Sequence, residues 1–68
     1  MDPMETEIMK YFQHNTTNAL YRILPNGHRQ RLTEDGWILV STYTSPMVLE
    51  MRYVKLSKEE TVKRILKQ

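Results

Sequence analysis

The spacing of hydrophobic residues predicts a helix near the start of the chain. Four apolar residues fall at helical spacing and form one face: Met4, Ile8, Tyr11 and Phe12. Before them, Asp2-Pro3-Met4-Glu5 supplies an N-cap residue, a proline at the first helical position and the acid of a capping box. We therefore expect a helix over about residues 3–14.

After residue 18 the pattern changes to one typical of strands. Pro25-Asn26-Gly27 separates two short runs, and Asn-Gly is a strong signal for a hairpin. Glu34-Asp35-Gly36 and Ser45-Pro46 indicate two further turns. The sequence therefore predicts four strands, over about residues 19–24, 28–33, 37–44 and 47–56.

A second capping box, Ser57-Lys58-Glu59-Glu60, predicts a final helix over about residues 58–67. The whole chain, residues 1–68, is expected to form one small α+β domain in the order α-β-β-β-β-α. Its sheet would be an antiparallel meander, with both helices packed on one face. The expected core of the sheet consists of Tyr21, Ile23, Leu32, Ile38, Val40, Leu49, Met51 and Tyr53.

The register of the two hairpins decides which side chains share a face, because residues opposite each other point the same way. A two-residue Asn26-Gly27 turn would place Arg22 opposite Arg31, and a hairpin around Ser45-Pro46 would place Leu39 opposite Arg52. These pairings gather a candidate partner-binding surface on the side away from the helices. Its members are Arg22, Arg29, Arg31, Trp37, Leu39, Tyr43, Val48 and Arg52.

Composition limits the ways in which the chain can be stabilised. With 68 residues and no cysteine, it forms no disulfide and no zinc ribbon, so a compact core or a partner subunit must suffice. The longest apolar run, residues 37–40, is far shorter than the roughly 20 residues of a membrane span. The acidic start of the chain does not look like a signal peptide. We expect a cytoplasmic location.

The net charge of +2 is small, but four bases and no acid fall between residues 8 and 33. Arginine beside tryptophan and tyrosine is typical of protein interfaces, including homodimers. The same combination also binds single-stranded nucleic acid, where rings stack on bases and guanidinium groups contact phosphates. Both hypotheses remain open from the sequence.

Catalytic and metal-binding patterns are missing from the sequence. His14 and His28 each lack a second ligand at suitable spacing, and Ser41 and Thr42 lack a neighbouring base. Both glycines fall in turns, so there is no phosphate-binding loop and no cofactor is expected. We expect a non-enzymatic binding module with a protein-interaction, regulatory or inhibitor role, as a homodimer or with another protein. The alternative is an RNA- or single-stranded-DNA-binding module that uses the same face.

Overall fold

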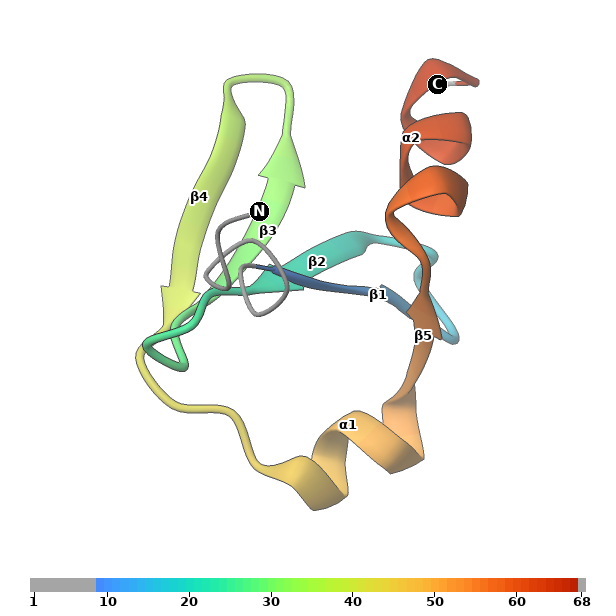
Figure 1. The fold of residues 1–68 in the computed structure, drawn as a ribbon. Helices are drawn as coiled ribbons and strands as arrows, with labels where there is room; N and C mark the ends of the chain where they lie inside the picture. Colours follow the sequence, from blue (N-terminus) through green and yellow to red (C-terminus); the bar gives the residue numbers. More distant parts are fainter. Residues whose placement is uncertain (1–8, 68) are drawn as a thin grey trace, which may run out of the picture.

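The computed structural model describes residues 9–67, which form a five-stranded antiparallel sheet and two helices (Figure 1). In chain order the elements are β1 (Lys10–His14), β2 (Leu20–Ile23), β3 (Arg29–Thr33), β4 (Gly36–Ser41), α1 (Pro46–Arg52), β5 (Tyr53–Leu56) and α2 (Lys58–Leu66). Across the sheet the order is β4-β3-β2-β1-β5. The first four strands form a meander, and β5 returns to pair with β1. The predicted α+β class with an antiparallel meander is confirmed.

The expected helix over residues 3–14 is wrong for its second half. Lys10–His14 is strand β1, while residues 3–8 lie outside the described part of the chain. β1 lies between β2 and β5. Phe12 lies on one face of this strand and Tyr11 on the other. A central strand that packs on both faces has adjacent apolar residues, so its pattern resembles one turn of a helical stripe.

The expected strand over residues 47–56 is wrong for its first half. Pro46 begins α1, with Ser45 as its N-cap residue, and Met, Leu and Glu within it are favourable helix formers. Only Tyr53–Leu56 is extended, and it pairs with β1. The expected strand over residues 37–44 ends at Ser41. The expected pairing of Leu39 with Arg52 is therefore absent.

The final helix begins where the capping box predicts. The Ser57 hydroxyl accepts a hydrogen bond of 3.1 Å from the backbone N–H of Glu60. We expected two helices on one face, whereas α1 and α2 lie at opposite ends of β5 and on opposite sides of β1 and β2 (Figure 1). Each face of the sheet is therefore only partly covered by a helix.

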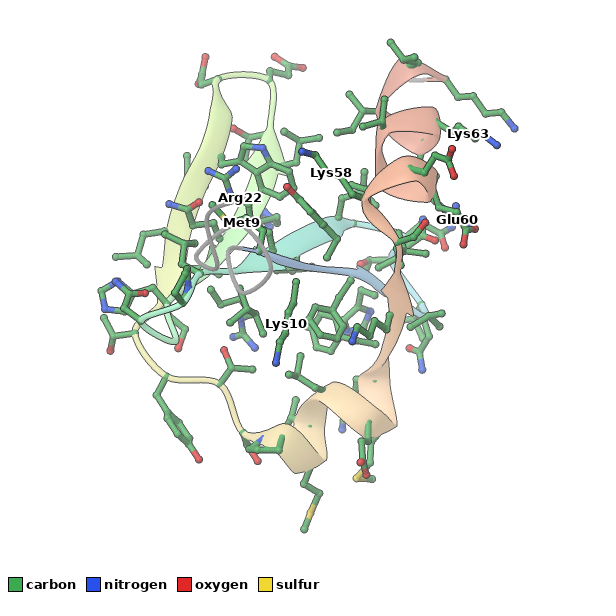
Figure 2. The ribbon with its side chains drawn as sticks, viewed as in Figure 1. Met9, Lys10, Arg22, Lys58, Glu60 and Lys63 are labelled. Atoms are coloured by element: carbon green, nitrogen blue, oxygen red, sulfur yellow. The ribbon has the colours of Figure 1, made fainter. Side chains whose placement is uncertain are left out.

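Strand pairing divides the sheet residues into two faces, because side chains alternate along a strand and match across a pair. The α2 face carries Tyr11, Gln13, Leu20, Arg22, Gln30, Leu32, Trp37, Leu39, Val54 and Leu56. The α1 face carries Lys10, Phe12, His14, Tyr21, Ile23, Arg29, Arg31, Ile38, Tyr53 and Lys55. In Figure 2 Arg22 and Lys10 extend to opposite sides of β1 and β2.

The turn between β2 and β3 sets this division, and it has three residues, not two. The backbone N–H of Leu24 donates to the carbonyl of His28 at 2.9 Å, closing a loop of Pro25, Asn26 and Gly27. A type I′ turn would require a positive φ at both Asn26 and Gly27. Gly27 has a φ of 91°, but Asn26 does not have a positive φ. The extra residue shifts the register by one. Arg22 therefore lies opposite Gln30, not Arg31.

The core is small and is divided between the two faces of the sheet. Leu20 and Leu56 are buried on the α2 face, where Thr61 of α2 is also buried, and Phe12 is buried on the α1 face beside Tyr53. The expected core positions Ile38, Val40 and Met51 are 40%, 40% and 66% exposed, respectively. Those three predictions are wrong, because β4 is an edge strand and Met51 belongs to a surface helix.

We predict that Phe12→Ala removes most of the stability of the domain. Truncating a buried phenylalanine costs about 3–5 kcal/mol, which is comparable with the stability that a core of this size supplies. Chemical denaturation measures the loss. As a matched control, Leu66→Ala alters a residue that is 78% exposed and should change the free energy of unfolding by less than about 0.5 kcal/mol. Equal effects of the two substitutions would contradict the assigned core.

Candidate functional site

The eight residues expected to form one surface are divided by the observed register. Arg22, Trp37 and Leu39 share the α2 face. Arg29 and Arg31 lie on the opposite face, because the three-residue turn places them across from Ile23 and Tyr21. The remaining three expected residues, Tyr43, Val48 and Arg52, lie in the loop before α1 or within α1. The candidate site is therefore the group around Arg22.

The Arg22 side chain is oriented by contacts with residues of β3 and β4. The Cζ atom of its guanidinium lies 4.6 Å from the centre of the Trp37 ring, close enough for a cation–π interaction. Its Nε donates a hydrogen bond of 2.7 Å to Oε1 of Gln30 on β3. The Tyr11 ring lies 6.3 Å from the Trp37 ring, tilted by 54°. Trp37 and Gln30 thus position the guanidinium without neutralising its charge, and Tyr11 packs near Trp37.

No carboxylate of residues 9–67 forms a salt bridge with Arg22. Within that part of the chain the one salt bridge joins Arg64 to Glu60, at 3.3 Å, on α2. Arg22 itself is half-buried, and a cation removed from water is usually paired with an anion. Nε is bonded to Gln30, and within residues 9–67 the two terminal nitrogens have no hydrogen-bond partner, so they could bind a carboxylate or phosphate in the bidentate geometry that arginine favours.

An exposed apolar strand borders this group. β4 lies at the edge of the sheet, and its residues Ile38, Leu39 and Val40 are 40%, 53% and 40% exposed. Leu39 continues the row that runs from Arg22 through Gln30 across the α2 face. The site therefore combines an oriented cation with exposed apolar surface.

Arg29 has a different environment on the α1 face. Its guanidinium lies 5.9 Å from the ring centres of both Tyr21 and Tyr53, whose rings meet edge to face at 5.1 Å. Its Nε is buried and has no hydrogen-bond partner in the described part of the chain. Burial raises the pKa of the Tyr53 hydroxyl above its ordinary value of 10.0, while the charge of Arg29 acts in the opposite direction. Arg29 is thus part of an aromatic cluster, whereas Arg31 is exposed.

His14 stabilises the turn between β1 and β2. Its Nδ1 accepts a hydrogen bond of 3.2 Å from the backbone N–H of Thr16, and its ring packs on Tyr53 at 5.0 Å.

Residues 9–67 contain no group of three potential metal-ligating side chains. In the same range, neither helix has the length and apolar character needed to span a membrane.

Sequence reasoning missed Tyr11 and Gln30 as neighbours of Arg22. The helical spacing places Tyr11 in a helix, and a two-residue turn places Gln30 on the opposite face from Arg22. The signal for the longer turn was Pro25, since proline followed by one residue and then glycine suits a type I turn ending in a left-handed residue. The sequence did contain that information.

Comparison with protein-family models, curated proteins and solved structures finds no match to this chain. Its function must therefore be inferred from the residues and contacts described above.

The raised pKa of Tyr53 predicts a loss of stability at alkaline pH. The folded protein holds the hydroxyl proton more tightly than the unfolded chain does, so the free energy of unfolding should fall as the pH rises above 10.0 through the folded pKa. Denaturant titrations across this range measure the slope. Tyr53→Phe should fall less steeply than the unsubstituted protein, and identical slopes would contradict the assignment.

Proposed function

We propose that this protein is a small non-enzymatic module that binds another protein through Arg22, Trp37 and Leu39 on its α2 face. The observation that carries the proposal is the Arg22 guanidinium, which Trp37 and Gln30 orient beside an exposed apolar edge, with no carboxylate partner among residues 9–67. A partner that presents both an acid and apolar side chains would complete this group. Such a module fits a regulatory or inhibitory role.

The distribution of hydrophobic residues supports a protein partner. Among residues 9–67, three hydrophobic residues are buried and ten large ones are exposed. The exposed residues are Ile38, Leu39, Val40, Tyr43, Met47, Val48, Met51, Val54, Val62 and Leu66. Apolar surface of this extent favours contacts with proteins, including a second copy of the chain.

The cytoplasm remains the expected compartment, because a cysteine-free chain does not depend on an oxidising environment.

Affinity capture with matched variants tests this proposal. We predict that the immobilised protein retains a specific partner from nuclease-treated lysate of its native host, and that Leu39→Ser and Trp37→Ala each abolish retention. Leu66→Ser is the matched control, since it also replaces an exposed leucine, but on α2. Far-UV circular dichroism checks that all three variants remain folded.

Equal retention by Leu39→Ser, Trp37→Ala and Leu66→Ser would contradict the proposed surface. Sedimentation analysis then distinguishes the homodimer from a complex with a different protein, because self-association depends on the concentration of this chain alone.

Nucleic-acid binding is the second candidate function. The observation that favours it is the position of the Lys58 side chain. Lys58 extends from the start of α2 toward the β3–β4 hairpin in the view of Figure 2, on the same side of the sheet as Arg22. A base stacked on Trp37 with its phosphate on Arg22 would use the same contacts as an acidic protein. The apolar residues of β4, however, have no role in such a complex.

If nucleic acid is the partner, a labelled single-stranded oligonucleotide should bind at low ionic strength. Its affinity should fall steeply with salt, because each phosphate contact releases counterions. Fluorescence of Trp37, the single tryptophan of the chain, provides the signal, since stacking quenches it. Absence of binding at low salt would remove this candidate.

A further inference from the structure

Strand β4 is an open edge of the sheet. It pairs with β3 on one side, and no other strand of the described residues, 9–67, pairs with its far side. Resting on the proposed function, we propose that the partner binds as an added strand along β4 and places an acidic side chain against Arg22. The occupant is an extended segment of another protein that carries both acidic and apolar residues.

The composition of β4 is what favours strand addition. Exposed edges are normally protected by a charge or a proline, since their unpaired N–H and C=O groups otherwise recruit another strand. From Gly36 to Ser41 there is neither, and Ile38, Leu39 and Val40 are all exposed. The opposite edge, β5, carries Lys55 and is only four residues long between two helices. Of the two edges, β4 is therefore the suitable one.

The charges beside β4 specify the chemistry of the added strand. The Arg22 guanidinium lies 4.6 Å from the ring of Trp37, which belongs to β4 itself. An added strand would lie about 4.8 Å from β4, and the proposal places a glutamate on its α2 face, directed across Trp37 toward the Arg22 guanidinium. On the other face Arg31 is exposed and lies opposite Ile38. Cations therefore flank the edge on both faces, and acids complement them.

A second copy of the chain complements this edge poorly. Two antiparallel β4 strands would supply no carboxylate to Arg22, because β4 contains no acidic residue. They would also bring the two copies of Arg31 toward each other across the junction. The nearest acids, Glu34 and Asp35, lie in the turn beyond the end of the strand. Charge complementarity thus favours a different, acidic protein.

An irregularity in the sheet limits the length of pairing. The register between β3 and β4 shifts between Arg29 and Gln30, which leaves Val40 as an extra residue on β4. Bulges of this kind bend a strand and interrupt its ladder. We therefore expect the added strand to pair along Gly36–Leu39.

Selection from a random peptide library displayed on phage tests the proposal without a known partner. The enriched peptides should contain acidic residues alternating with apolar ones. Bound to the isotopically labelled protein, a synthetic copy of one such peptide should protect amides of Gly36–Leu39 from hydrogen exchange. The same peptide with alternate backbone nitrogens methylated should lose binding, because it cannot donate the strand hydrogen bonds.

Arg22→Gln should weaken binding of the selected peptide roughly tenfold, because a charge-assisted hydrogen bond is lost. Lys63→Gln is the matched control, since it removes one positive charge from a side chain that extends away from β4 (Figure 2). It should leave the affinity unchanged. Arg31→Gln is a second test at an exposed position, and it should reduce the affinity even if Arg22→Gln perturbs the fold.

Several results would overturn strand addition. These are a library without enriched peptides, a peptide whose amide protection maps to α1 or α2, and a methylated peptide that binds as well as its parent. Self-association that protects Gly36–Leu39 without any peptide would assign the edge to a second copy. If binding maps to α1 or α2, the chain is still a protein-binding module, but β4 is not its docking edge. This outcome distinguishes failure of strand addition from failure of protein binding in general.

Discussion

The three-residue turn at Pro25–Gly27 determines which side chains of β3 share a face of the sheet with Arg22. Side chains alternate along a strand, so one additional turn residue exchanges the faces of all residues on β3 relative to β2. This places Gln30, not Arg31, beside Arg22 and leaves the two arginines on opposite faces. The like-charge pair that a shorter turn would create is avoided. The positive charges are consequently divided between two different environments.

Those two environments give arginine two roles. On the α1 face Arg29 packs between Tyr21 and Tyr53, where its buried Nε makes it part of the aromatic packing. On the α2 face Arg22 is stacked on Trp37 and bonded to Gln30, with its terminal nitrogens directed to no carboxylate of the described chain. The first arrangement contributes to the fold, and the second is suited to an external anion.

The small size of the hydrophobic core explains why many apolar side chains remain exposed on the surface. A chain of 68 residues that divides two helices between two sheet faces cannot cover either face completely. The edge strand β4 and the helix α1, which buries no residue, carry six of the ten large hydrophobic side chains that are exposed in the described chain. A binding partner would supply the missing cover, and the oriented Arg22 would give that contact its charge preference.

The sequence by itself determined the α+β class, the positions of the turns at Pro25–Gly27 and Glu34–Gly36, and the final helix. These follow from local signals such as the Ser57 capping box and from alternation within a strand. Tertiary structure decided that Lys10–His14 is a central strand and that β5 pairs with β1. Both depend on contacts between residues distant in sequence. Local periodicity cannot encode them, because a strand buried on both faces has the same apolar pattern as a short helix.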